Sequence, residues 1–114
     1  MKDENAIKDK SMAFAVRIVR LCKYLSEQHE FVMSKQVLRS GTSIGANVRE
    51  AQYGQSKRDF AAKMSIALKE AAETEYWLEL LHKTDYLQSE AYQSIRTDCQ
   101  EICKLLTVIV HNSK

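Results

Sequence analysis

The feature that most constrains the fold is a regular alternation of three- and four-residue spacings between apolar or small residues. In residues 57–84 the alternation runs through Phe60, Met64, Ala67, Ala71, Thr74, Leu78 and Leu81. A β-strand requires a period of two, whereas this spacing places every member on one stripe of an α-helix. Such stripes are typical of helices that pack nearly antiparallel in a left-handed bundle. The segment is therefore predicted to be a long helix that faces other helices.

Three more segments carry the same pattern, at about residues 5–28, 34–53 and 89–111. Their stripes comprise Ile7, Phe14, Ile18, Leu21 and Leu25; Val37, Gly41, Ile44, Val48 and Ala51; and Tyr92, Ile95, Cys99, Ile102, Leu106 and Ile109. The chain has no proline and only three glycines, and Gly54 and Ser56 are expected to end the second helix and cap the third. Short connections make neighbouring helices antiparallel. We predict an all-α fold, an antiparallel up-down-up-down four-helix bundle in a single domain over residues 1–114.

The stretch RSGTSIGANVREA, residues 39–51, contains two of the three glycines. A phosphate-binding P-loop needs a preceding strand and a Gly-Lys-Ser or Gly-Lys-Thr ending, and this stretch has neither. Gly41 and Gly45 lie four residues apart on the apolar face, where small residues let a facing backbone come close. We interpret the stretch as continuous helix with close packing at both glycines. The alternative is a ligand or chain that approaches the glycines.

A polar stripe runs beside these glycines, and a second one follows the third helix. We consider five residues as members of a structural polar network: Ser43, Asn47, Glu50, Glu70 and Glu73. If the stripes face each other, Asn47 and the carboxylates are expected to form a buried hydrogen-bonded network that sets helix register. The alternative interpretation is a solvated flank of each helix.

Apolar side chains exceed what one bundle core requires. Candidates for an oligomer interface lie off the main stripes: Met12, Val16, Val19, Ile66, Trp77, Leu80, Leu105 and Val108. Exposed apolar patches usually mark interfaces, so homo-oligomerisation is expected. The alternative is that wide stripes flank a thick core.

The charge pattern bears on nucleic-acid binding. The net charge is +2, and the pI of about 8.4 lies below the value of ~9 typical of dedicated nucleic-acid binders. Candidate contacts to RNA or DNA are Lys10, Arg17, Arg20, Lys35, Arg39, Lys57 and Arg58. Each cation that reaches a phosphate releases counterions, and a ring of several copies multiplies a small patch. The alternative is a solvated set of surface charges.

Recognisable catalytic chemistry is missing from the sequence. Glu79 and His82 have the Glu-x-x-His spacing of di-metal bundles, but such sites need that pair twice, and Cys99 and Cys103 have no second pair. We expect no catalytic residue, metal site or cofactor, and keep a metal-dependent helical-bundle enzyme as a remote alternative. The odd number of cysteines, the charged first residues and the lack of a membrane-spanning window indicate a cytoplasmic protein with no membrane partner.

Residues 38–81, LRSGTSIGANVREAQYGQSKRDFAAKMSIALKEAAETEYWLELL, resemble the bacterial four helix bundle protein family, also called the 23S ribosomal RNA intervening-sequence protein family. Positions that match its pattern are Ser43, Asn47, Val48, Glu50, Phe60, Ala67, Glu73 and Leu78, whereas Ala51 stands where many members have glycine. The resemblance implies a compact bundle that assembles into a ring, most often a homopentamer. The reading frames of many family members lie within insertions in ribosomal RNA genes. The family is also similar to the accessory variability protein of diversity-generating retroelements, a pentameric bundle that binds nucleic acid and a reverse transcriptase. The hypothesis is a non-enzymatic oligomer that binds RNA, DNA or a nucleic-acid-processing partner; the alternative is a protein-interaction scaffold without nucleic-acid affinity.

Overall fold

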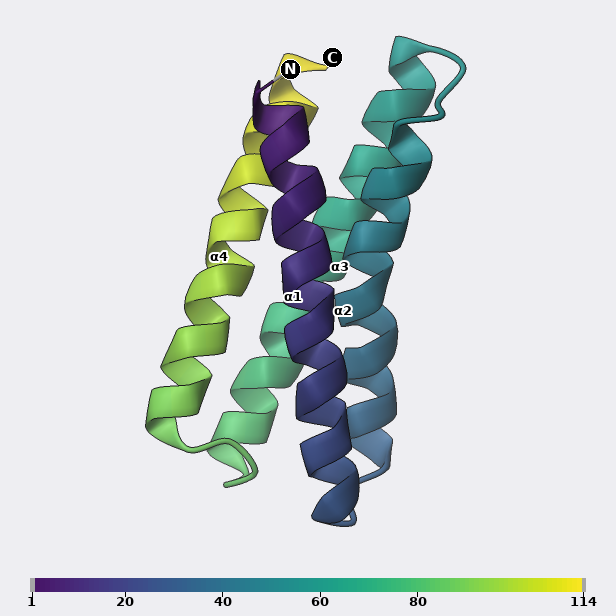
Figure 1. The fold of residues 1–114 in the computed structure, drawn as a ribbon. Coiled ribbons are helices and arrows are strands. Elements are labelled where there is room, and N and C mark those ends of the chain that lie inside the picture. The colour runs from purple at the N-terminus through teal and green to yellow at the C-terminus, as the bar shows by residue number, and fades with distance from the viewer. Residues whose placement is uncertain (1, 114) are drawn as a thin grey trace.

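Four α-helices make up most of the computed structural model, which describes residues 2–113. They are α1 (Lys2–Glu27), α2 (Val32–Ala51), α3 (Lys57–Lys83) and α4 (Ser89–Asn112). Figure 1 shows successive helices running in opposite directions, with both termini and the α2–α3 connection at one end of the bundle. Each helix packs against its neighbours in the chain, and α4 closes the bundle against α1. The predicted all-α, up-down-up-down bundle is confirmed.

The core consists of the predicted stripes. Every stripe position on α1, α2 and α4 is buried, and on α3 only Phe60 is partly exposed. The largest side chains that are shielded from solvent come from all four helices: Phe14, Ile18, Leu25, Ile44, Met64, Leu78, Leu81, Ile102 and Leu106. Spacings of three and four residues keep one face of each helix turned to its neighbours over its whole length. This is why the sequence pattern identifies the core so completely.

Two helices differ from their predicted boundaries by more than one residue: α1 begins three residues earlier, and α2 begins and ends two residues earlier. The reason at the start of α2 is Glu30, whose carboxylate accepts hydrogen bonds from the backbone N–H groups of Val32 (3.2 Å) and Ser34 (2.8 Å). These bonds satisfy amides that a helix start leaves without partners. A glutamate outside the helix is not a usual capping residue, so the sequence pattern did not reveal it.

The α2–α3 connection contains one confirmed and one corrected expectation. Ser56 caps α3 as predicted, because its side chain accepts a hydrogen bond from the Asp59 N–H (3.0 Å). Gly54 follows α2 without the left-handed backbone conformation that usually makes glycine a helix terminator. A Cβ atom at Gly54 would lie 3.1 Å from the Ala51 carbonyl oxygen and 3.2 Å from the Phe60 nitrogen. A side chain here would require these backbone atoms to shift by a few tenths of an ångström, so tight space favours glycine at this position.

Residues 39–51 are helical throughout, as predicted, and the two glycines have different neighbours. A Cβ atom at Gly45 would lie 3.4 Å from the Ser11 carbonyl oxygen, so here the backbones of α1 and α2 do approach each other. At Gly41 the nearest atoms belong to the Ile18 side chain, at 2.7 and 2.9 Å. The expectation of backbone against backbone is therefore wrong for Gly41, because Ile18 fills the space that the missing side chain leaves.

Candidate nucleic-acid interface

Three of the seven basic candidates are engaged in ion pairs between helices. Lys10 of α1 pairs with Glu101 of α4, which raises the pKa of the lysine through their hydrogen bond. Seven residues further along α1, the Arg17 Nη1 atom lies 2.6 Å from the Asp98 Oδ2 atom of α4. Arg39 of α2 pairs with carboxylates of α3. These cations are partly neutralised by acidic neighbours, which reduces their availability to phosphate groups.

The other four basic candidates are Arg20, Lys35, Lys57 and Arg58. All are exposed, and no ion pair involves them within residues 2–113. Lys57 and Arg58 begin α3, directly after the α2–α3 connection. Arg20 and Lys35 lie toward the opposite end of the bundle, on α1 and α2 respectively (Figure 1). The structure therefore separates the predicted cations into two groups.

One end of the bundle concentrates positive charge. We call the exposed residues Arg49, Tyr53, Lys57 and Arg58, around the α2–α3 connection, the basic end. Residues 49–69 contain five basic and two acidic residues. Both acids have local partners: Glu50 accepts from Lys63 Nζ at 2.9 Å, and Asp59 accepts from the Gln55 N–H at 3.2 Å.

Tyr53 stands out at this end because 83% of its surface is exposed. Arg49 and Tyr53 were not among the predicted contacts, although both shortly precede Gly54 in the sequence. Proteins that bind single-stranded nucleic acid combine exposed aromatic rings, on which bases stack, with cations that contact the phosphates. The sequence signal was present in the stretch REAQYGQSKR, and the structure adds that its basic and aromatic side chains are exposed.

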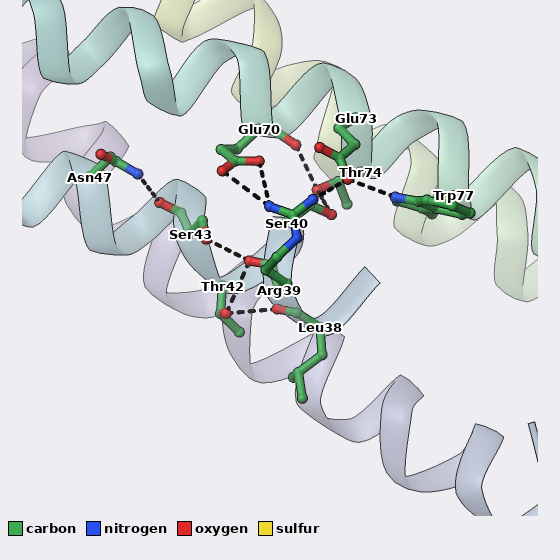
Figure 2. A network of polar contacts seen from close by, with 10 residues as sticks. All are labelled: Leu38, Arg39, Ser40, Thr42, Ser43, Asn47, Glu70, Glu73, Thr74 and Trp77. Carbon is green, nitrogen blue, oxygen red and sulfur yellow. Dashed lines mark hydrogen bonds and ion pairs between the residues drawn. The ribbon is translucent and has the colours of Figure 1, made fainter. Parts of the chain in front are cut away.

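The polar network between α2 and α3 is centred on Arg39, as Figure 2 shows. Its guanidinium lies between the carboxylates of Glu70, at 3.3 Å, and Glu73. Glu73 also accepts a hydrogen bond from Trp77 Nε1 (2.9 Å). The bond from Trp77, together with that from Arg39, lowers the pKa of Glu73.

Ser43, Asn47 and Glu50, three predicted members of this network, do not bind the α3 carboxylates that Arg39 contacts. The Ser43 hydroxyl donates to the Arg39 carbonyl (2.6 Å) and the Asn47 amide donates to the Ser43 carbonyl (2.8 Å), both one turn back on α2. Glu50 pairs with Lys63 instead. The short Ser43 and Asn47 side chains are satisfied by their own helix, whereas the long arginine reaches the carboxylates of α3. The buried polar contact lies beside them, where the Ser40 and Thr74 hydroxyls are 2.9 Å apart.

The candidates for an oligomer interface divide into exposed and partly buried residues. Met12, Val16 and Val19 of α1, Ile66 of α3 and Val108 of α4 are exposed. Trp77 and Leu105 pack partly against the core, and Leu80 is half-buried. A groove of about 200 Å³ continues the α1 face toward α2, between Met12 and Ala15 on one side and Gly45 and Ala46 on the other. The α1 and α3 faces lie on diagonally opposite helices, with α1 in front and α3 behind in Figure 1.

The residues considered for catalysis have structural contacts. Glu79 lies 3.8 Å from Lys83, and the His82 ring donates from Nδ1 to the Leu87 carbonyl (2.9 Å) while stacking on Tyr92. The hydrogen bond to Cys103 and burial raise the pKa of Cys99, so this thiol stays protonated in the core. Within residues 2–113, no three His, Cys, Asp or Glu side chains are placed to share a metal ion. None of the helices in this range has the length and apolarity needed to cross a membrane.

Comparison with known proteins places the chain in a family. A crystal structure of a protein of unknown function from the S23 ribosomal protein family of Bacteroides thetaiotaomicron VPI-5482 is similar to it, with a TM-score of 0.94 and 63% sequence identity. That match covers 96% of this chain and 98% of the other. No curated protein matches the chain significantly. Residues 3–108 match the family described as 23S rRNA-intervening sequence protein. The chain belongs to the 23S rRNA-intervening sequence protein family, as its resemblance had predicted.

Proposed function

We propose that this protein is a non-enzymatic ring of identical bundles that binds structured RNA or DNA through the basic end of each subunit. The observation that carries the proposal is that Arg49, Lys57 and Arg58 are exposed on either side of the exposed Tyr53 in the sequence, with no ion pair to an acidic residue within residues 2–113. The description of the family by 23S rRNA makes ribosomal RNA the first ligand to test.

The position of the apolar faces supports assembly into a ring. Met12, Val16 and Val19 lie on α1, and Ile66 lies on the diagonal helix α3. Two different patches on opposite sides of one molecule favour head-to-tail contacts, which generate a closed ring when the rotation per subunit closes. The family resemblance supports a ring of five. The similarity to the accessory variability protein, which stays a prediction, supports the same assembly.

Ring formation strengthens a weak patch. When the ring axis runs along the helices, every subunit presents its basic end on the same face of the ring. Binding at one subunit then places the other subunits at high effective concentration, so that modest individual affinities combine. The net charge of a single chain, +2, is too small to bind nucleic acid strongly alone. Because these contacts release counterions, affinity is expected to fall steeply with added salt.

The test is fluorescence anisotropy of a labelled 23S rRNA hairpin with wild-type protein and with the double variant Lys57→Glu/Arg58→Glu. Wild type is expected to bind at ~50 mM salt and to lose most of its affinity by ~200 mM. The double variant is expected to bind at least about tenfold more weakly. The matched control, Lys23→Glu/Lys35→Glu, makes the same charge change with exposed residues at the opposite end of the bundle and should retain more affinity.

Two results contradict the proposal. One is binding that does not change between low and high salt, and the other is equal affinity of both double variants. If the protein binds no RNA at low salt but a specific protein partner copurifies with it, the alternative of a protein-interaction scaffold is supported instead.

A further inference from the structure

A groove of about 380 Å³ lies at the end of the bundle opposite the basic end. It is formed by the C-terminal half of α1, the α3–α4 connection and the start of α4, and we call it the α1–α4 groove. Its floor is apolar and consists of the buried side chains of Leu21, Leu87 and Ile95. Its rim carries polar and aromatic side chains: Arg17, Arg20, Tyr24, Tyr86 and Gln88. A small-molecule pocket typically has ~300–1,000 Å³ and the same combination of apolar walls and few polar groups.

The wall formed by the α3–α4 connection is held in place by local hydrogen bonds. The backbone N–H groups of Tyr86 and Leu87 both donate to the Leu81 carbonyl, at 2.9 and 3.2 Å. The His82 ring donates a hydrogen bond from Nδ1 to the Leu87 carbonyl. Asp85, with φ of 71°, turns the chain sharply just before Tyr86. The connection is therefore expected to present its groove residues without first having to fold around a ligand, which lowers the cost of binding.

The two arginines of the rim are in different states. Arg17 is oriented by Asp98 Oδ2 (2.6 Å) and by the hydroxyl and carbonyl oxygens of Ser94, at 3.1 and 3.4 Å. A guanidinium carries five N–H donors, so Arg17 retains donors after these contacts. Arg20, one turn further, is exposed and has no ion pair or side-chain hydrogen bond to residues 2–113. Arg20 is therefore the guanidinium that is available to the oxygens of a phosphate group, whereas Arg17 is partly neutralised by Asp98 and offers only its remaining N–H donors.

We propose that the α1–α4 groove binds a nucleotide, with the base against Tyr24 and the phosphate at Arg20. Tyr24 is 43% exposed, so that its ring is accessible to a planar heterocycle. Tyr86 also lines the groove, and the Gln88 amide offers both a donor and an acceptor to the edge of a base. The combination of aromatic ring, arginine and amide is the one by which proteins recognise unstacked bases. The ligand is either a free nucleoside monophosphate or an unpaired nucleotide of an RNA strand, and the experiment distinguishes them.

The direct test is calorimetric titration of the full chain with UMP and AMP, using ribose 5-phosphate and inorganic phosphate as probes that lack the base. Saturable binding of at least one nucleotide is expected, with ribose 5-phosphate weaker by about tenfold because stacking is lost. Amide shifts in NMR spectra should concentrate at residues 17–24 and 86–95. Absence of saturable binding at millimolar nucleotide, or equal binding of ribose 5-phosphate, overturns the proposal.

Variants separate stacking from general damage to the bundle. Tyr24→Ala and Arg20→Ala are each expected to weaken nucleotide binding by about tenfold, whereas Tyr24→Phe keeps the ring and should bind like wild type. The control Arg58→Ala lies at the basic end and should leave nucleotide binding unchanged. If Tyr24→Ala binds as tightly as wild type, or if an acidic peptide binds the groove and nucleotides do not, the proposal is wrong.

Competition against bound UMP distinguishes a free nucleoside monophosphate from an unpaired nucleotide of an RNA strand as the ligand. A duplex RNA with an unpaired 3′ overhang displaces UMP if the groove accepts nucleotides of a strand, and a blunt duplex of equal length should not. If neither duplex competes, the free monophosphate is the ligand. Either result supports a nucleotide site, and both are independent of the hairpin binding proposed for the basic end, which depends on Lys57 and Arg58.

Discussion

Gly41 and Gly45 occupy successive turns of α2, but their surroundings predict opposite effects of the same substitution. A Cβ atom at Gly41 would come within 3.0 Å of two carbon atoms of Ile18, which is fully buried and cannot move aside easily. At Gly45 the nearest atom, the Ser11 carbonyl oxygen, is 3.4 Å away and leaves room for a methyl group. Packing at α1 thus requires glycine at one position and tolerates alanine at the other.

We expect Gly41→Ala to destabilise the protein by about 1 kcal/mol, because overpacking costs ~1–3 kcal/mol and the gain in helix propensity offsets ~1 kcal/mol. Gly45→Ala should be neutral or stabilising by up to ~1 kcal/mol, since the gain in helix propensity is not offset by a steric clash of the new Cβ atom. Denaturant unfolding followed by circular dichroism measures both at one protein concentration. Equal effects of the two substitutions would contradict the difference in packing.

Glu30 gives a second prediction at this scale. Its buried carboxylate caps α2, so Glu30→Ala should lower the free energy of unfolding by about 1 kcal/mol, in the range of ~0.5–2 kcal/mol for lost caps. Glu27→Ala, an exposed glutamate at the end of α1, is the matched control and should have little effect. Thermal unfolding of both variants tests this. A loss as large in Glu27→Ala would mean that negative charge, and not capping, matters there.

At the scale of the elements, α2 and α3 are joined by the Arg39 network and by the buried contact between Ser40 and Thr74. The Thr74 hydroxyl donates to the Glu70 carbonyl (2.8 Å), so its oxygen is left to accept from Ser40. Arg39 and its carboxylates remain partly exposed, so each ion pair contributes little alone. Their value lies in fixing which turns of the two helices face each other.

The lowered pKa of Glu73 makes this network sensitive to acid. A carboxylate with a lowered pKa stabilises the fold above its ordinary value of 4.5, and the contribution is lost as the pH falls through the lowered value. Glu73→Gln should therefore be less stable than wild type at neutral pH, by up to about 1 kcal/mol given its exposure. The difference should shrink as the pH falls below 4.5. Unfolding measured across this range checks it, with Glu79→Gln as control; a constant difference would contradict the ionic role.

At the scale of the whole molecule, the diagonal placement of α1 and α3 makes a specific prediction about assembly. Wild type is expected to have a mass of about five times the 13.1 kDa chain by light scattering, as the family resemblance implies. Val16→Glu blocks the α1 face and Ile66→Glu blocks the α3 face, so each variant alone should be a monomer. A mixture of the two should form dimers, because each retains the face that the other lacks.

The control for assembly is Val32→Glu, which changes an exposed apolar residue at the start of α2, outside both faces. It should keep the wild-type mass. Self-association through a two-fold contact of α1 with α1 would show a different pattern, since Ile66→Glu would then still dimerise and mixing would add nothing. Retention of the full mass by both face variants would remove the ring from the proposal.

The helices and the core were predictable because their signal is local and repeats within each segment. Spacings of three and four residues identify the buried stripes, including Thr74, whatever the neighbouring helix is. The boundary of α2 was missed because Glu30 acts from outside the usual capping position. Of the candidate interface, the sequence predicted Lys57 and Arg58 but not the exposed Tyr53 beside them.

The sequence by itself thus determined the fold class, the order of the helices and the faces that they bury, since helical periodicity and turn residues depend on neighbours in the chain. Only the tertiary structure decided which charges are free. Arg17 meets Asp98 and Arg39 meets Glu70 across separations of 81 and 31 residues, and the choice of partner depends on which helices adjoin and at which turn. The α1–α4 groove arises in the same way, because packing brings Tyr24 and Tyr86 from distant segments to one end of the bundle.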